Sequence, residues 1–449
     1  MGIYNKFLNV ARRNKTVGKM TLTVDAARAA FNSSTTTVSV KQARQYVVSP
    51  GLQKRGFSFK METTINQNEA LPKCKRRHNM ESIIYVGMDV HKESYSLCCY
   101  DPRTDRYLYE HKMKSTTTNV LKYLDSVKKQ LGDVIFICGY EAGPTGFGLC
   151  RDLLRKDIAC VVMAPTSLKR NSNYKVKNDK VDARLLAKDL FTHDYSPVHL
   201  SSQKEEAIKE FCRMRRSIMT ELKTAKQVLL AFLLRQGKHF DGKTHWSGEH
   251  RKWLKQITFE QPYLQEAFDE YLISVNELEA RLKRVEHRLE EISKDEEVES
   301  KVKKLICFCG IDTLTAVSIV SEVGDFMRFA RAWDFANFVG LSVGEHSSGG
   351  KERHLGITKS GNSYLRRLFT ESAKSLKKTS MKSKKSKRLI DRQQGNDPRV
   401  IAYADKCRYR LKYKMMSLEN RGKAANVAST AAARELACFV WGMMTDHIA

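Results

Sequence analysis

Apolar residues gather in three short segments between residues 82 and 114. The segments read IIYVGMDV, SYSLCCYD and RYLYEHKMK, and the polar separators between them, HKE and PRTD, are only three and four residues long. Short apolar runs that are joined by short polar connections are typical of β-strands in consecutive hairpins. The pattern therefore predicts a meander of three strands.

After residue 115 the apolar pattern changes to an alternation of helix and strand. TNVLKYLDSVKKQL and TGFGLCRDLLRKD have helical spacing, whereas VIFICGYE and IACVVMAP are the continuous apolar runs of fully buried strands. The resulting order, βββ-α-β-α-β followed by helices, is that of an RNase H-like fold with a mixed sheet. Other α/β folds would normally alternate strand and helix from the start.

Two long helices are predicted in the middle of the chain. Residues 203–236 carry apolar residues at steps of three and four, and a loop around 237–248 follows. A second helix covers roughly 262–305, with apolar residues in an a/d pattern and charged residues beside them. Such a pair forms either an antiparallel arm within one chain or a coiled coil between two chains, and the spacing fits both.

The C-terminal third begins with LICFCGIDTLTAVSIVSEVGDFMRF, which resembles half of a helix-hairpin-helix. In such a motif the turn and the following helix N-terminus can hold a phosphate; the alternative is a plain helical hairpin in a core. ANFVGLSV then leads into the loop EHSSGGKERHLGITKSGN, and NSYLRRLFTESAKSL continues as a helix. A basic stretch at 377–414 and a final helix close the chain.

Positive charge is concentrated in two parts of the sequence. The chain has 79 Lys and Arg against 50 Asp and Glu, a net charge of +29. Residues 1–80 have fifteen basic and three acidic side chains (net +12), and residues 366–423 have nineteen and five (net +14). This excess favours a polyanionic partner, with nucleic acid first. In 377–414 the interleaved Tyr403, Tyr409 and Tyr413 fit stacking on bases, although a solvated basic helix face is the alternative.

Composition also narrows the compartment and the domain organisation. A run of about 18 apolar residues, as a membrane span needs, is not found, and the first thirty residues have no apolar signal core. The 11 cysteines match neither a disulfide framework nor zinc spacing, so reduced thiols in a cytoplasmic protein are expected. Residues 1–80 are predicted to be a mostly disordered basic extension, and we hypothesise that Met80 corresponds to an alternative or original start codon. The predicted parts are 1–80 (extension), 81–200 (α/β domain), 201–300 (long helices) and 301–449 (C-terminal helical domain).

Four carboxylates occupy positions that the predicted fold brings together. Asp89 ends the first strand and Glu141 ends the fourth, and Asp179 and Asp182 lie at i and i+3 in the first turn of a helix. Converging carboxylates that use only oxygen ligands favour Mg²⁺ or Mn²⁺, and paired ions of this kind carry out phosphoryl chemistry on nucleic acids. Taken singly, Asp179 could be a helix N-cap, Asp182 a partner of the helix dipole and Glu141 a turn residue. The GPTGFG segment lacks phosphate-loop spacing, and we interpret its glycines as structural.

The sequence resembles the insertion-sequence transposases of the IS110 and IS1111 group. The resemblance rests on YVGMDVHK, YEAGPTG, KNDKVDARLLA, GIDTLTAVSIVSEVGDFMRF and GLSVGEHSSGGKERHLGITKSGNSYLRRL, which together cover about residues 82–445. It implies a RuvC-like domain whose DEDD carboxylates are Asp89, Glu141, Asp179 and Asp182, a coiled-coil arm, and a C-terminal transposase domain with a nucleophilic serine. It also implies a tetramer in the bacterial cytoplasm at the nucleoid, element-end and target DNA as substrates, and a structured non-coding guide RNA encoded by the element.

The serine of this expected site lies in the loop EHSSGGKERH. A serine hydroxyl is a poor nucleophile at neutral pH and needs a metal or a base, while adjacent glycines let a phosphate approach the backbone. We predict Ser347 as the nucleophile and Ser348 as second choice. The side chains expected to contact phosphates or nucleic acid are Lys351, Arg353, Lys359, Arg366 and Arg367.

Two other functions fit part of the pattern. In an RNase H-like nuclease or junction resolvase, water would attack and the serines would belong to a turn. In a non-catalytic nucleic-acid-binding protein, the site would have decayed. The complete carboxylate set argues against decay, and the separate domain with the GLSVGEHSSGG loop argues against a simple nuclease.

Overall fold

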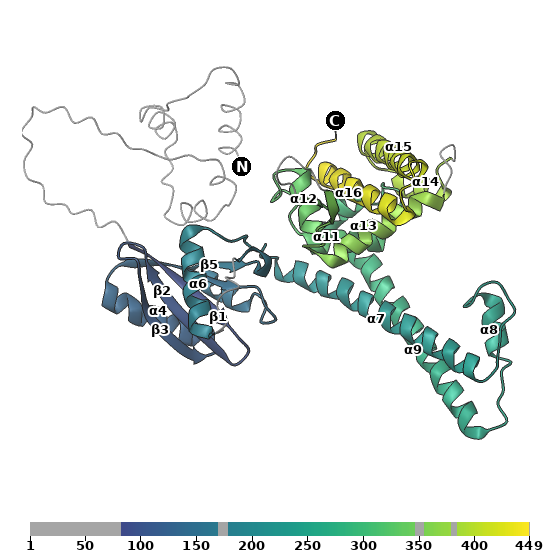
Figure 1. Cartoon of the computed structure of the whole chain (residues 1–449), viewed down its shortest axis with the longest axis horizontal. Helices are drawn as coiled ribbons and strands as arrows, with labels where there is room; N and C mark the ends of the chain where they lie inside the picture. The colour runs from purple at the N-terminus through teal and green to yellow at the C-terminus, as the bar shows by residue number, and fades with distance from the viewer. Residues whose placement is uncertain (1–81, 169–177, 346–353, 379–383, 449) are drawn as a thin grey trace, which may run out of the picture. The chain divides into compact units, whose positions relative to one another are not determined.

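The structure is a computed structural model that describes residues 82–168, 178–345, 354–378 and 384–448. The first part of the described chain is an α/β domain built on a five-stranded sheet (Figure 1). Its strands are β1 (Ser82–Val90), β2 (Ser94–Asp101), β3 (Arg106–Lys114), β4 (Val134–Glu141) and β5 (Ala159–Met163). All five were expected from the apolar runs of the sequence. The predicted extension 1–80 lies outside the described residues.

The sheet has the strand order β3-β2-β1-β4-β5. β2 is antiparallel to β1 and β3, whereas β4 runs parallel to β1 and β5 parallel to β4. The antiparallel half follows from the short connections between the first three strands, and the parallel half requires the two intervening helices. This mixed sheet is compatible with the RNase H-like fold predicted from the order of the elements.

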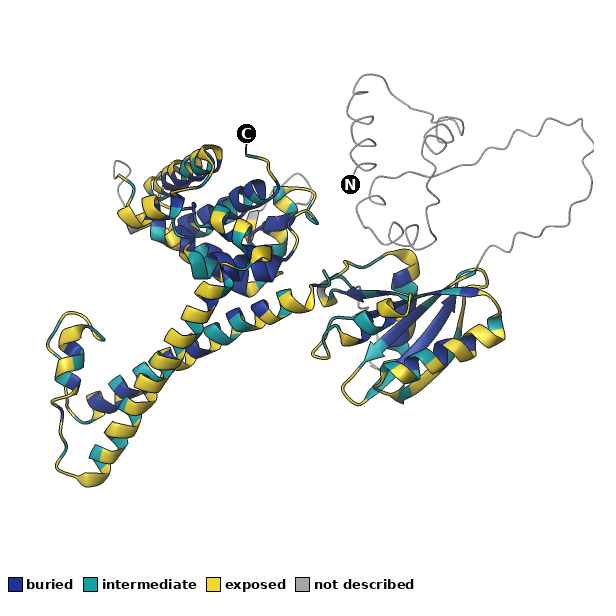
Figure 2. Cartoon of the chain, turned by 180° about the vertical axis from the view of Figure 1, so that it is seen from behind, coloured by how far each residue is buried: buried dark blue, intermediate teal, exposed yellow. Residues whose placement is uncertain are grey.

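Helices cover both faces of the sheet. The alternating residues Ile84, Val86 and Met88 of β1 form one core with helices α4 (Thr117–Leu131) and α5 (Gly148–Arg155). The opposite face carries Met163 and packs against Leu186 and Leu190 of a third helix, α6 (Asp179–Thr192). The strands β2 and β4 are largely buried, whereas the edge strand β3 has no buried residue (Figure 2).

Helix α6 lies very close to β1, because the strand has no side chain at the crossing point. A Cβ atom added to Gly87 would lie 2.1 Å from the carbonyl oxygen of Ala183 and 2.3 Å from the amide nitrogen of Ala187. Gly87 pairs with Gly139 of β4, where an added Cβ would lie 2.8 Å from Leu190. The two glycines thus set the height of α6 above the sheet, and with it the position of the first turn of this helix.

A helical hairpin follows the α/β domain in the sequence. Its two long helices are α7 (Gln203–Arg235) and α9 (Pro262–Ile292). The short helix α8 (Gly248–Leu254) lies between them in the sequence, and α10 (Glu296–Leu305) follows α9. The ion pairs Arg215–Glu286 and Lys226–Glu279 run in opposite order along α7 and α9, so these two helices are antiparallel within one chain. Whether they also form a coiled coil with a second chain stays a prediction.

The prediction of one continuous helix over 262–305 was wrong, because the segment forms two helices, α9 and α10. It is interrupted between Ile292 and Glu296, where the side chain of Asp295 accepts a hydrogen bond from the backbone N–H of Glu297 and caps the N-terminus of α10. An Asp side chain that bonds to the backbone in this way competes with helix continuation. The charged SKDEE segment contains neither Gly nor Pro, the usual sequence signals of a helix end.

The C-terminal part is a helical domain with a small two-stranded sheet. Its elements are α11 (Thr313–Val323), α12 (Ala332–Val339), β6 (Val343–Glu345), β7 (His354–Ile357), α13 (Ser363–Ser375), α14 (Lys387–Gln393), α15 (Pro398–Asn420) and α16 (Ala425–Met444). Its core also includes Ile208 and Cys212 of α7 and Leu289 of α9, so both hairpin helices extend into it. In the described part of the chain, no helix is long and apolar enough to span a membrane.

Candidate metal centre

Asp89 and Glu141 lie at the ends of two neighbouring parallel strands. The last paired residues of β1 and β4 are Met88 and Tyr140, so the two carboxylates take the next position on each strand. Side chains alternate between the faces of a sheet, and Gly87 faces α6; Asp89 and its neighbour Glu141 therefore face α6 too. Both residues are half-buried. The two carboxylates that the sequence placed at strand ends are thus on adjacent strands and face the same side of the sheet.

Asp179 and Asp182 belong to the first turn of α6. The N-cap of this helix is Asn178, whose side chain accepts a hydrogen bond from the N–H of Lys180 at 3.2 Å. The alternative that Asp179 itself is the N-cap is therefore wrong. Since Asn178 performs this role, the carboxylates of Asp179 and Asp182 are left for other partners on one side of the helix.

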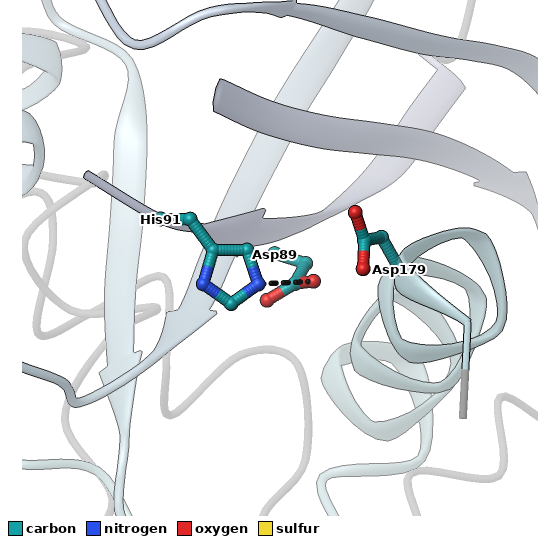
Figure 3. A group of neighbouring side chains, drawn as sticks. All are labelled: Asp89, His91 and Asp179. Atoms are coloured by element: carbon teal, nitrogen blue, oxygen red, sulfur yellow. Dashed lines mark hydrogen bonds and ion pairs between the residues drawn. The ribbon is translucent and has the colours of Figure 1, made fainter. Parts of the chain in front are cut away.

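The first turn of α6 and the end of β1 come together at Asp89 (Figure 3). One ligand atom from each of Asp89, Asp179 and His91 lies within 4.8 Å of the other two. Burial raises the pKa of Asp89, the hydrogen-bonded imidazole of His91 lowers it, and the negative charges of Asp182 and Asp179 raise it further, with a net upward shift. Three of the four predicted carboxylates therefore interact, and Glu141 ends the adjacent strand.

Two residues near these carboxylates were missed by sequence reasoning. His91 Nε2 lies 3.1 Å from Asp89 Oδ2, and Lys112 Nζ lies 2.8 Å from Asp179 Oδ2. The Lys112 ammonium group holds the pKa of Asp179 below its usual range. The Asp-x-His spacing of MDVHK could have indicated His91. Lys112 reaches the site only through the strand register, in which Ser96 pairs with both Asp89 and Lys112.

The donor set fits a hard divalent cation. Carboxylate oxygens are the ligands that Mg²⁺ and Mn²⁺ prefer, and several carboxylates in one place repel one another unless cations or protons offset their charge. Here Lys112 and His91 already bond to two of the carboxylates, which indicates a strongly negative local field. Asp89 and Asp179 have ligand atoms close enough to hold such an ion, and Asp182 and Glu141 stay predicted further ligands.

Comparison with known proteins decides the family. Residues 86–236 match a DEDD-type IS110 transposase domain, and residues 303–388 match the family described as "Transposase IS116/IS110/IS902 family". A putative transposase of Sinorhizobium fredii is 30% identical over 363 residues, which are 81% of this chain and 88% of that protein. The chain belongs to the IS110 transposase family.

Two further relatives agree with this assignment. The transposase of insertion sequence element IS1533 from Leptospira borgpetersenii is 30% identical, with 77% of this chain and 99% of that protein covered. The transposase of element IS1111A from Coxiella burnetii is 26% identical, with 74% and 89% covered. This transposase therefore spans most of the length of its relatives, and the expected IS110/IS1111 resemblance is confirmed.

The predicted serine loop of the transposase falls between β6 and β7. Ser347, Ser348, Lys351 and Arg353 lie outside the described residues, so their roles stay predictions. The strands on either side were not expected from the sequence: β6 and β7 pair antiparallel, with Val343 opposite Ile357. Glu345 and His354, the described residues on either side of 346–353, are paired in this hairpin.

The three other basic residues predicted to contact nucleic acid have different surroundings. Arg366 donates hydrogen bonds to the backbone carbonyl oxygens of Val339, at 3.3 Å, and Lys359, at 3.1 Å, and therefore ties α12 to the segment after β7. Arg367 is exposed and pairs with Glu371 at 2.8 Å. Lys359 is exposed. Of the three, Lys359 and Arg367 are accessible to a phosphate.

The basic stretch of the transposase forms α14 and α15. Tyr409 and Tyr413 of α15 are 51% and 68% exposed and lie one helical turn apart, as a stacking surface requires. Tyr403 was predicted to belong with them, but its ring packs against Phe308 and Phe439, and burial raises its pKa to about 12. Tyr403 is partly buried and packs against the core, because its position on α15 faces Phe439 of α16.

Proposed function

We propose that this DNA transposase cleaves and rejoins DNA with a divalent cation, Mg²⁺ or Mn²⁺, held by Asp89, Glu141, Asp179 and Asp182. The observation that carries the proposal is the close approach of α6 to β1, which brings the ligand atoms of Asp89 and Asp179 within 4.8 Å of each other. A bound cation would supply charge neutralisation and polarise a phosphodiester. The chain's own contribution is to fix the carboxylate oxygens on two strands and one helix.

We further propose that a serine of the loop between β6 and β7 is the nucleophile, with Ser347 preferred over Ser348. As its Oγ bonds to the phosphorus, the hydroxyl loses its proton, and the bond from phosphorus to one deoxyribose oxygen breaks. The released sugar oxygen takes up a proton, and the product is a phosphoserine that links protein and DNA. The reverse attack by a sugar hydroxyl of another strand rejoins DNA and frees the serine. Lys351 and Arg353 would offset the charge of the phosphate.

The experiment that tests this step is a search for the covalent intermediate. The transposase is incubated with labelled end DNA of its element, the RNA of the element and Mg²⁺, and protein–DNA adducts are separated on a denaturing gel. We expect an adduct with the wild type and with Ser348→Ala, and none with Ser347→Ala. An adduct that is lost only in Ser348→Ala would assign the second serine instead.

The alternative function is a metal-dependent nuclease in which water attacks. It shares the carboxylates, so only the fate of the DNA distinguishes the two. Nicked DNA with a free 3′-hydroxyl, formed without an adduct and at the same rate in both serine variants, would support the nuclease and contradict the serine mechanism.

Guide-RNA binding and assembly into tetramers are also proposed. RNA binding is supported by the net +14 of residues 366–423, together with the exposed rings of Tyr409 and Tyr413. The tetramer is proposed on the family resemblance alone. Protein purified from cells that carry the whole element should contain a discrete RNA, and its mass in solution should be that of a multimer. A monomer that stays monomeric with this RNA bound would remove the assembly proposal.

A further inference from the structure

His91 lies beside the carboxylates but is not one of the four acidic positions. It follows β1 directly, and its imidazole points toward Asp89 and Asp179 in Figure 3. Its Nε2 atom is 3.1 Å from Asp89 Oδ2, and the side chain is 57% exposed whereas that of Asp89 is 17% exposed. A half-open imidazole at the edge of a carboxylate group can either orient the carboxylate or bind the same cation.

We propose that His91 is a ligand of the divalent cation through Nε2, so that the centre is a mixed oxygen and nitrogen site. This inference rests on the proposed function, because it places His91 on the cation that the carboxylates hold. Its consequence is metal selectivity: the site would favour Mn²⁺ and other first-row transition metals over Mg²⁺ more strongly than four carboxylates alone would.

The separation of the two donor atoms agrees with shared ligation. Neighbouring ligands at right angles on an ion with bonds of about 2.1 Å lie about 3.0 Å apart. The observed 3.1 Å between Nε2 and Oδ2 therefore suits two adjacent positions on one ion as well as it suits a hydrogen bond. Ligation requires the neutral tautomer with its proton on Nδ1, since the Nε2 lone pair must face the cation.

The chemistry of the donor gives the direction of the selectivity. An imidazole nitrogen binds transition metals well, whereas Mg²⁺ strongly prefers oxygen. Replacing His91 by Asn retains a side chain that can hydrogen-bond to Asp89 but removes the imidazole. His91→Asn should therefore lower the affinity for Mn²⁺ about tenfold or more while it changes the affinity for Mg²⁺ much less.

The test is pulsed electron paramagnetic resonance on the full-length transposase, without a histidine tag, loaded with Mn²⁺. We expect ¹⁴N coupling from an imidazole in the wild type, and its loss in His91→Asn at a Mn²⁺ concentration that still fills the site. The matched control is His287→Asn on α9, a 73% exposed histidine outside the site, which should retain the coupling.

The outcomes separate this inference from the proposed function. If Asp89→Asn abolishes Mn²⁺ binding but the wild type shows no ¹⁴N coupling, or keeps its coupling in His91→Asn, then His91 only positions Asp89 and the inference is overturned. If Asp89→Asn binds Mn²⁺ as tightly as the wild type by titration calorimetry, the carboxylate centre of the proposed function itself is wrong.

Discussion

At the scale of single residues, Gly87 decides how the acidic turn of α6 reaches the sheet. Backbone atoms of Ala183 and Ala187 occupy the space of its missing side chain, so a methyl group there could fit only if the whole helix moved. The same crossing explains why a glycine follows Val86 inside an otherwise apolar strand. Glycine in a strand interior often marks the close approach of another backbone.

We predict that Gly87→Ala destabilises the α/β domain and weakens cation binding together. Overpacking of a tight core costs about 1–3 kcal/mol, and an obstacle made of backbone atoms gives the upper part of that range or more. Thermal unfolding and Mn²⁺ titration measure the two effects. Gly148→Ala in α5 is the control, because an added Cβ there meets nothing within 4 Å. Unchanged Mn²⁺ affinity in Gly87→Ala would mean that the position of α6 does not determine the site.

Lys112 gives a second prediction at this scale. Its ammonium group bonds to Asp179 and competes with any cation for that carboxylate. Lys112→Met should therefore strengthen Mg²⁺ binding, by about two- to fivefold, because ion pairs with this much solvent exposure are weak. Lys114→Met removes the same charge two residues further along β3 and should have a smaller effect. Weaker Mg²⁺ binding in Lys112→Met would show that the lysine supports the site instead of competing.

At the scale of elements, the five strands of the sheet and the two long helices could be predicted from apolar spacing. The face shared by Asp89 and Glu141 followed from the parallel pairing of β1 and β4. Lys112 could not be predicted, because it reaches Asp179 only through the register of β3 against β2. The β6–β7 hairpin was missed because VGE and HLGI are too short for a periodic signal. The break before α10 depends on a capping contact of Asp295 that the charged sequence does not distinguish from helix.

The segment around His250, at the end of the helical hairpin, gives a prediction of how stability depends on pH. His250 of α8 is fully buried among the rings of Phe240, His245, Trp246 and Trp253, and among the described residues neither of its nitrogens has a hydrogen-bond partner. Burial lowers its pKa, and the positive charges of His245 and Arg251 lower it further. The unfolded segment therefore binds a proton more readily than the folded one, and stability falls as the pH drops below about 6.5, the ordinary histidine pKa.

Tryptophan fluorescence measures this local opening. Between pH 7 and pH 5 the emission of the wild type should shift to longer wavelength, because Trp246 and Trp253 beside His250 gain contact with water. His250→Phe keeps the aromatic packing without a titrating group and should show a smaller shift. Equal shifts in both proteins would contradict the role of His250.

At the scale of the whole molecule, the four candidate carboxylates and the larger excess of positive charge lie in different parts of the sequence. The carboxylates belong to the α/β domain, whereas residues 366–423 carry nineteen basic against five acidic side chains. The other basic segment, residues 1–80, directly precedes the α/β domain, so the two basic segments lie on either side of the carboxylates in the sequence. Contacts to phosphates release counterions, so nucleic-acid affinity should fall steeply with added salt.

We predict that Tyr409→Ala and Tyr413→Ala weaken binding to single-stranded nucleic acid. Loss of one stacked ring costs about 1–3 kcal/mol of binding free energy, or roughly five- to 150-fold in affinity. The slope of log affinity against log salt concentration should stay unchanged, because no charge is removed. Fluorescence anisotropy at several salt concentrations measures both quantities. Lys406→Gln, at an exposed position of the same helix, should instead reduce the dependence of the affinity on salt concentration. Unchanged affinity in both tyrosine variants would show that this face of α15 is only a solvated surface.

The central claim is that strand cleavage depends on the carboxylates gathered by α6 and β1. It is tested most directly by the rate at which the transposase cleaves element-end DNA in Mg²⁺ after Asp89→Asn or Asp179→Asn. We predict a loss of at least about a hundredfold in each, since each substitution removes the charge of a proposed cation ligand, and a wild-type rate for Asp152→Asn on α5. Cleavage by Asp89→Asn at the wild-type rate would contradict the claim.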